Sequence, residues 1–297
     1  MTEEIYRIIG RIGYVTYFLI ITFVLLYYRF PSNEFNNYFQ TKINNLFPSY
    51  RISTLKTTVS IPYGLKIYKI VACPANNPET PVFTADQMII MPVIRSFFRK
   101  GIDLDINCEA YGGNITGVIH IPADSSISYQ ETMLDIRNLN LPELLPSSGS
   151  IENNIIGILN GSITLKSNIK DPLQISGEAN INIKDTEIRL REPVFGLGHF
   201  ELNAVSAKII LRNRRADVND GRFNSDIMRG SFSGNIQLND NLQDSTLDLK
   251  GSIEPFAAFL KELESSGKIT GSLRKYLQKG ALSFTLKGRL NKYKIKI

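Results

Sequence analysis

Side chains that commonly take part in catalysis or bind metals are sparse in this 297-residue chain, which has only two histidines. His120 lies in the apolar run 118–121, and His199 follows a Gly-Leu-Gly turn at residues 196–198. A helical zinc site needs a second histidine four residues away, and a hydrolytic triad needs a nucleophile and a carboxylate around the histidine. Neither setting occurs, so we expect both histidines to be structural.

The glycine pairs and the carboxylates also give no sign of a catalytic site. Gly112-Gly113 and the pair Gly196/Gly198 do not stand between a strand and a helix, as a phosphate-binding loop requires. Within strands, such glycines mark bulges or tight bends. The carboxylates are scattered, and no two of them form an acid/base couple. The sequence therefore predicts no enzyme, no metal site and no cofactor.

The two cysteines leave two possibilities open. Cys73 and Cys108 are allowed to pair in an oxidising compartment, but the sequence does not set the separation of their Cα atoms. Cys108 falls on the apolar positions of an alternating run that includes Ile106 and Ala110. This position is typical of a small buried hydrophobic residue.

The most apolar segment is residues 12–28, which are uncharged and lie between Arg11 and Arg29. As a helix the segment spans about 26 Å, close to the thickness of a hydrocarbon core. Bulky residues follow it instead of the small residues of a cleavage site, so we expect an uncleaved anchor and not a signal peptide. The residues predicted to face lipid are Ile12, Tyr14, Phe18, Leu19, Ile20, Phe23, Leu25 and Tyr28. Arg7 and Arg11 predict a cytoplasmic tail, which places the rest of the chain outside the cytoplasm.

Beyond the anchor the hydrophobic pattern changes to period two. Apolar and polar residues alternate over 178–184, 200–204, 231–238, 247–253 and 282–290, which predicts strands with one apolar and one polar face. Turn signals between strands favour antiparallel pairing, and they stand at Asn160-Gly161, Asp171-Pro172, Asp220-Gly221, residues 239–241 and Lys279-Gly280. The predicted fold is mainly β, an antiparallel sheet that is either continuous or divided into two similar halves.

Three short helices are predicted to accompany the sheet. They begin at Pro31-Ser32, Met91-Pro92 and Glu254-Pro255, and the first has an apolar side formed by Phe35, Phe39, Ile43 and Leu46. The chain then divides into residues 1–30 (tail and anchor), 31–50 (amphipathic juxtamembrane helix) and 51–297 (β domain).

A single-layer sheet with few helices has too little cover for all its apolar side chains. Either a second sheet covers them, or the sheet folds into a trough with room for acyl chains. The side chains predicted to form this apolar face are Ile163, Leu165, Ile181, Ile183, Phe200, Leu202, Phe232, Ile236, Leu247, Leu249, Phe284 and Leu286.

Positive charge is concentrated at the C-terminal end, because residues 268–297 contain nine lysines and arginines and no acidic residue. We favour an edge strand that lysines protect from aggregation. The alternative is a contact with an acidic partner or anionic lipid headgroups, made by Lys287, Arg289, Lys292 and Lys294. Nucleic acid is not an expected partner for a domain outside the cytoplasm.

The order of these parts resembles type II secretion system protein N. The resemblance is carried by the aromatic-proline pair Phe30-Pro31 after the anchor and by four segments: MIIMPVIRSFFRKGIDLDINCEAYGGNITGVIHI (88–121), LNGSITL (159–165), GSFSGNIQLNDNLQDSTLDLKGSIEP (230–255) and FTLKGRL (284–290). The strand, short helix, strand and Gly-Gly module within the first of these segments is also similar to AsmA-type proteins.

The first resemblance implies a non-catalytic subunit of a bacterial secretion machine, single-pass in the inner membrane, with a periplasmic β domain that binds other secretion-system subunits. The second implies an elongated, curved antiparallel sheet, a trough whose apolar concave face binds or conducts phospholipid acyl chains.

Overall fold

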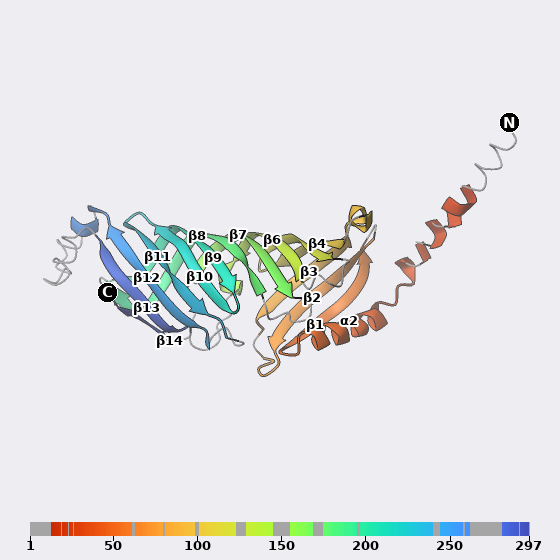
Figure 1. Ribbon diagram of the computed structural model, residues 1–297, viewed down its shortest axis with the longest axis horizontal. Helices are drawn as coiled ribbons and strands as arrows, with labels where there is room; N and C mark the ends of the chain where they lie inside the picture. Colours follow the sequence, from red (N-terminus) through yellow and green to blue (C-terminus); the bar gives the residue numbers. More distant parts are fainter. Residues whose placement is uncertain are drawn as a thin grey trace, which may run out of the picture.

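The computed structural model describes residues 13–18, 20–22, 24–25, 27–60, 63–79, 81–98, 101–122, 129–144, 155–168, 175–194, 197–239, 244–257, 259–261, 281–290 and 292–296. Fourteen strands form one sheet in which the spatial order equals the chain order (Figure 1). The strands are β1 (Tyr50–Ser60), β2 (Gly64–Pro74), β3 (Phe83–Pro92), β4 (Gly101–Ala110), β5 (Gly113–Pro122), β6 (Tyr129–Asn140), β7 (Ile155–Asn168), β8 (Ile175–Val194), β9 (Leu197–Arg212), β10 (Arg215–Asn224), β11 (Met228–Gln237), β12 (Thr246–Pro255), β13 (Leu282–Arg289) and β14 (Lys292–Lys296).

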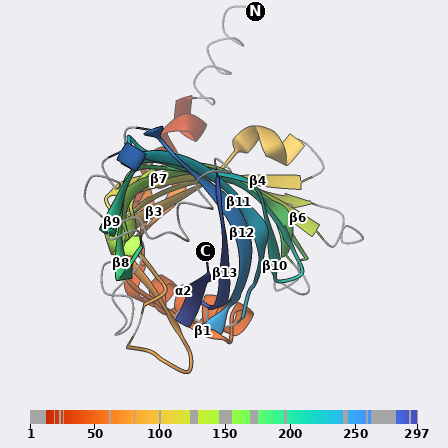
Figure 2. The same cartoon turned by 90° about the vertical axis from the view of Figure 1, so that its left-hand side faces the viewer.

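Every neighbouring pair of these strands is antiparallel, so the prediction of a mainly β, antiparallel fold is confirmed. Of the two arrangements left open by the sequence, the chain forms one continuous sheet. The sheet is elongated and curls about its long axis, so that it has a concave and a convex face (Figure 2).

Tight turns connect two of the hairpins. Tyr111 and Gly112 link β4 to β5 with φ angles of 50° and 69°. Asn213 and Arg214 link β9 to β10 with φ angles of 45° and 65°. Two successive positive φ angles are the signature of the two-residue type I′ turn, whose twist matches that of the strands it joins.

Two predicted turns are wrong. Asn160-Gly161 lies inside β7, and Asp220-Gly221 lies inside β10 at a β-bulge where Asp220 has a φ angle of 48°. These residue types also suit bulges and close strand contacts, and pairing with strands on both sides determined the outcome. The predicted turn before His199 falls at the reversal between β8 and β9, where Val194 pairs with Leu197. Leu197 and Gly198 already belong to β9, and Gly196 lies outside the described residues. The signals at Asp171-Pro172 and Lys279-Gly280 lie outside the described residues.

The first predicted helix is α2 (Ser32–Leu46), which packs against β1. The second is shortened to the 3₁₀ turn η1 (Ile94–Phe98), and α3 (Leu141–Leu144) adds a single turn after β6. At the third predicted site, residues 257 and 259–261 are helical, and the rest of that helix lies outside the described residues.

The predicted anchor is described only in part. Residues 13–18, 20–22, 24–25 and 27–28 are helical, whereas Ile12, Leu19 and Phe23 lie outside the described residues. Within the described part of the chain, no helix is both long enough and apolar enough to cross a membrane. The remaining residues of the predicted lipid-facing set are exposed: Tyr14, Phe18, Ile20, Leu25 and Tyr28.

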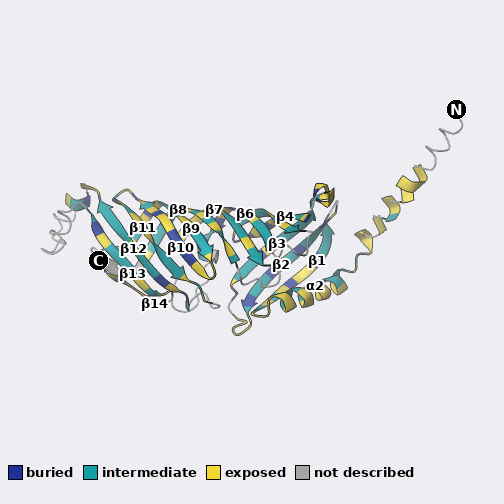
Figure 3. Ribbon diagram, viewed as in Figure 1, coloured by how far each residue is buried: buried dark blue, intermediate teal, exposed yellow. Residues whose placement is uncertain are grey.

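A cluster of buried apolar residues lies on strands β2, β3, β4 and β6 and in the turn between β4 and β5. It comprises Ile67, Ile70, Ala85, Cys108, Ala110, Tyr111, Ile136 and Leu139, and Phe39 of α2 packs against it. Elsewhere most apolar strand residues are only half-buried (Figure 3).

Candidate functional site

One row of residues crosses the whole sheet, with one member on each strand and each member paired directly with the next. In chain order its members are Val59, Leu65, Ile90, Ile106, Gly117, Leu134, Ile163, Ala179, Ile209, Val218, Gly234, Leu249, Leu286 and Ile295. Paired residues project from the same face of a sheet. One face is therefore apolar, or glycine, from the first strand to the last.

Neighbouring rows on this face have the same character. One of them contains Leu104, Ile119, Thr132, Leu165, Gly177, Leu211, Ala216, Ile236, Leu247, Gly288 and Tyr293. A row on the opposite face is mainly polar: Asp105, Val118, Met133, Thr164, Glu178, Ile210, Asp217, Asn235, Asp248, Lys287 and Lys294. We call the first face the apolar face and the second the polar face.

The strand register places together, on the apolar face, the twelve side chains that the sequence predicts for the apolar face of a trough. Ile163 and Leu249 belong to the fourteen-residue row. Leu202 pairs with Thr186, which lies at the bulge that shifts the β7–β8 register between Lys184 and Glu187. Leu202 and Leu247 are buried, whereas all the other predicted members remain partly exposed: Ile163, Leu165, Ile181, Ile183, Phe200, Phe232, Ile236, Leu249, Phe284 and Leu286. The described helices pack mainly on β1, β4, β6 and β7, and the described strands form no second sheet over this face.

Glycines on the apolar face permit the strong curvature. A Cβ atom added to Gly117, Gly177 or Gly234 would lie 2.1 Å from a carbonyl oxygen of the adjacent strand. A side chain there would force the strands apart, so glycine is needed where the face closes on itself. The rings of Phe223 and Phe284 cover Gly230 and Gly251 on the adjacent strands. Crowding of this kind identifies the apolar face as the concave one seen in Figure 2.

A stripe of amide side chains on α2 seals the free edge of β1, and sequence reasoning missed it. Asn36, Gln40 and Asn44 recur every fourth residue, so they lie on one face of the helix. Gln40 Nε2 donates to the Thr54 carbonyl oxygen at 2.8 Å, and Asn44 bonds both backbone groups of Ile52. The spacing of the three amides was the available signal, although the prediction considered only the apolar side of this helix.

The predicted basic residues lie at the other edge of the sheet, Lys287 and Arg289 on β13 and Lys292 and Lys294 on the last strand, β14. Lys287 pairs with Asp248 at 2.9 Å, and Arg289 approaches Asp244 at 3.8 Å, so these two are engaged within the polar face. Lys292 and Lys294 are exposed on the last strand and form no ion pair with any described residue. The expectation of a lysine-rich edge strand is confirmed by this topology.

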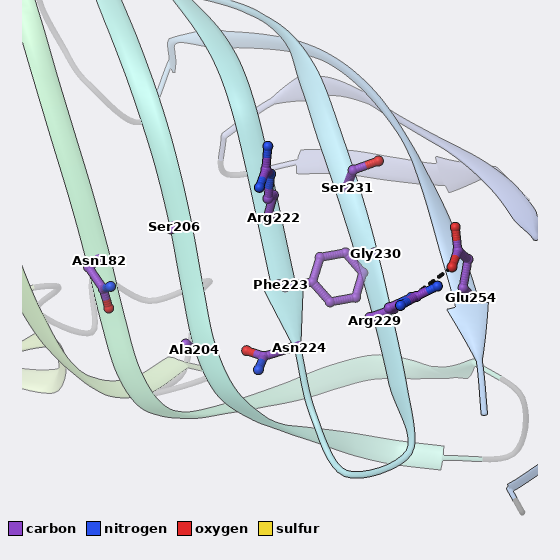
Figure 4. Close-up of a pocket in the computed structure, with 10 residues that line it drawn as sticks. All are labelled: Asn182, Ala204, Ser206, Arg222, Phe223, Asn224, Arg229, Gly230, Ser231 and Glu254. Carbon is purple, nitrogen blue, oxygen red and sulfur yellow. Dashed lines mark hydrogen bonds and ion pairs between the residues drawn. The ribbon is translucent and has the colours of Figure 1, made fainter.

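A pocket of about 390 Å³, lined by several charged and polar residues, lies between β8 and β12 on the polar face (Figure 4). Arg229 Nε contacts Glu254 at 2.8 Å, and Arg222 approaches Asp220 at 3.5 Å. Both guanidinium groups are thus already paired with carboxylates. The pocket therefore lacks the unpaired cation that would make it an anion site.

The cysteines are free and buried, which answers the open question about a disulfide. Ala72, next to Cys73, pairs with Phe83, whereas Cys108 pairs with Met88. Five residues of β3 separate these partners, roughly 16 Å, which is far beyond the reach of a disulfide. Burial, with a smaller contribution from the neighbouring Glu109 carboxylate, raises the pKa of the Cys108 thiol to about 11.

The histidines have ordinary surface partners. His120 Nδ1 lies 2.6 Å from Asp103 Oδ1, and His199 Nε2 lies 4.0 Å from a Glu201 oxygen. Among the described residues, no group of three histidine, cysteine or acidic side chains is placed to hold a metal ion.

Comparisons with known proteins do not identify a related protein. No family model, curated protein or solved structure matches the chain. The concave apolar face and the two dissimilar edges of the sheet are therefore the features from which a function has to be argued.

Proposed function

We propose that this protein is a non-catalytic component of a bacterial envelope whose concave apolar face holds the acyl chains of lipids. The observation that supports this is the unbroken row of apolar residues and glycines over fourteen strands, flanked by partly exposed side chains. Exposed apolar surface costs about 25 cal/mol for each Å² in contact with water, and hydrocarbon chains that cover it recover this free energy.

The length of the apolar face suits long hydrocarbon chains. Fourteen strands at a spacing of about 4.8 Å extend over roughly 60 Å. One leaflet of a bilayer contributes about half of the 30 Å hydrocarbon core, roughly 15 Å. The face therefore has room for several acyl chains in succession, an arrangement that suits binding or conduction along the sheet.

In this proposal residues 12–28 anchor the protein in the inner membrane, with the short tail in the cytoplasm and the β domain in the periplasm. The support is the uncharged sequence of the segment and the exposure of its described aromatic residues, such as Tyr14 and Tyr28.

A second candidate function is that of a subunit of a type II secretion system, as the sequence resemblance implies. The observation that favours an interaction role is β14, an edge strand whose Lys292 and Lys294 have no described ionic partner. An edge strand accepts an extended segment of another subunit through backbone hydrogen bonds. In a deletion strain, accumulation of secreted proteins in the periplasm would favour this role.

The groove is tested by extracting lipids from the full chain purified in mild detergent and quantifying them by mass spectrometry. Phe232→Asp places a carboxylate on the apolar face, whereas Ser233→Asp places the same group on the exposed polar face one residue away. We expect lipid to remain bound to wild type and Ser233→Asp and to be lost from Phe232→Asp. Recovery of no lipid from wild type would refute the groove.

A further inference from the structure

The connection between β3 and β4 displays three large apolar side chains in one turn. Phe98 is 90% exposed, Phe97 56% and Ile94 49%. Single exposed apolar residues are common on protein surfaces, but two adjacent phenylalanines with an isoleucine on one short turn form a contiguous patch.

The turn is held in place at its base. Ser96 lies under η1 and is 2% exposed. Its hydroxyl donates to the Val93 carbonyl oxygen at 2.6 Å and accepts from the Asp103 backbone N–H at 2.9 Å. The Val93 N–H donates in turn to the Asp103 carbonyl oxygen at 2.9 Å. These bonds fix the turn to both flanking strands, so the aromatic residues are presented outward by a rigid base.

The position of η1 in the fold indicates which kind of partner the apolar patch contacts. Figures 1 and 2 show η1 projecting from the first strands of the sheet, at the same end as the described helical residues 13–18, 20–22, 24–25 and 27–28. Those residues are also apolar and exposed, as Tyr14 and Phe18 illustrate. Arg95, beside the patch, is exposed as well. Aromatic rings with a neighbouring arginine suit the headgroup region of a bilayer, where the ring meets hydrocarbon and the guanidinium meets phosphate.

We propose that η1 is a second membrane contact, which inserts Phe97 and Phe98 into the interface of a phospholipid bilayer. This contact holds the first strands at the bilayer surface. Ile102, at the start of β4, lies on the apolar face beside Ile121 and is 39% exposed, so this face begins next to the contact. The role as an entry point for acyl chains rests on the proposed function, whereas the membrane contact itself rests on the patch and its location.

The chain contains no tryptophan, so a single introduced tryptophan reports on its own site. We compare Phe98→Trp with Met133→Trp, which lies on the polar face and is 53% exposed. Each full-length variant is reconstituted into vesicles of phosphatidylcholine and phosphatidylglycerol, with and without brominated acyl chains. We expect blue-shifted emission and several-fold stronger bromine quenching for Phe98→Trp than for Met133→Trp. Equal quenching at the two sites, with water-exposed emission at both, would overturn the proposal.

Phe97→Trp provides a second reporter in case Phe98→Trp does not give the β-rich circular dichroism of wild type. Lipid extraction from the detergent-purified protein, before reconstitution into vesicles, separates this inference from the proposed function. Bound lipid without quenching at η1 refutes the membrane contact and leaves the groove intact. Strong quenching at η1 without extractable lipid supports the contact and refutes the groove.

Discussion

Asn44 on α2 binds Ile52 on β1 in the manner of a neighbouring strand. Asn44 Nδ2 donates to the Ile52 carbonyl oxygen at 3.1 Å, and the Ile52 N–H donates to Asn44 Oδ1 at 2.7 Å. One amide thus satisfies both backbone groups of Ile52 that point away from β2. Edge strands left unpaired are templates for association with other chains, and here a helix removes that hazard.

Replacing Asn44 should therefore weaken the fold and expose the edge. We expect Asn44→Leu to lower the free energy of unfolding by about 2 kcal/mol, because two half-buried backbone groups lose their partner. Urea denaturation measures the loss, and size-exclusion chromatography detects association through the exposed edge. Asn45→Leu is the matched control, since Asn45 is exposed on the same turn of α2. Equal stability of the two variants would contradict the role of the amide stripe.

Gly234 should tolerate no side chain. Its φ angle is +144°, and an added Cβ would lie 2.1 Å from the Asp248 carbonyl oxygen. We expect Gly234→Ala to cost about 2–3 kcal/mol through backbone strain and displacement of β12. Gly13→Ala, where no atom lies within 4 Å of the added Cβ, should have no such effect. Thermal unfolding followed by circular dichroism compares the two, and an unchanged melting temperature for Gly234→Ala would contradict the crowding.

The Cys108 thiol should be inert in the folded protein. Burial raises its pKa from an ordinary 9.0 to about 11, so the folded state holds the proton more tightly than the unfolded chain does. Its stabilising contribution is complete below pH 9 and is lost as the pH rises through 11. In a Cys73→Ala background we expect iodoacetamide to modify Cys108 only after denaturation, as measured by mass spectrometry. Rapid labelling of the folded protein at pH 8 would argue against this burial.

The lysines of β14 should prevent self-association through this edge strand. Lys294→Val removes a charge from the edge, and we expect concentration-dependent self-association, measured by light scattering. Lys250→Val makes the same exchange at an exposed position of β12, which has a paired strand on each side, and should leave the protein unchanged. Association of both variants to the same extent would assign the effect to lost net charge instead of the edge.

Alternation along the chain was sufficient to predict which side chains share a face. Ile181 and Ile183 stand two residues apart, as do Leu247 and Leu249, and the strands place each pair on the apolar face. The pleat of a strand turns successive side chains to opposite faces, so this property is local and can be read from a few residues.

Bulges and edges were not predictable in the same way. Asp220-Gly221 has the composition of a turn, but β9 and β11 pair on either side and convert it into a bulge. The amides of Asn36, Gln40 and Asn44 find their hydrogen-bond partners only because α2 lies along β1. Both outcomes depend on contacts between segments that the sequence does not place side by side.

The sequence by itself determined the class of fold, the apolar and polar faces of the strands, and the lysine-rich character of the last strand, because each follows from the types and spacing of neighbouring residues. Only the tertiary structure decided that fourteen strands form one sheet and that its apolar face is concave and partly open. It also decided that α2 seals one edge, whereas no described helix or strand covers the other. Curvature and closure arise from bulges and from glycines such as Gly117, whose effect depends on the backbone of the adjacent strand.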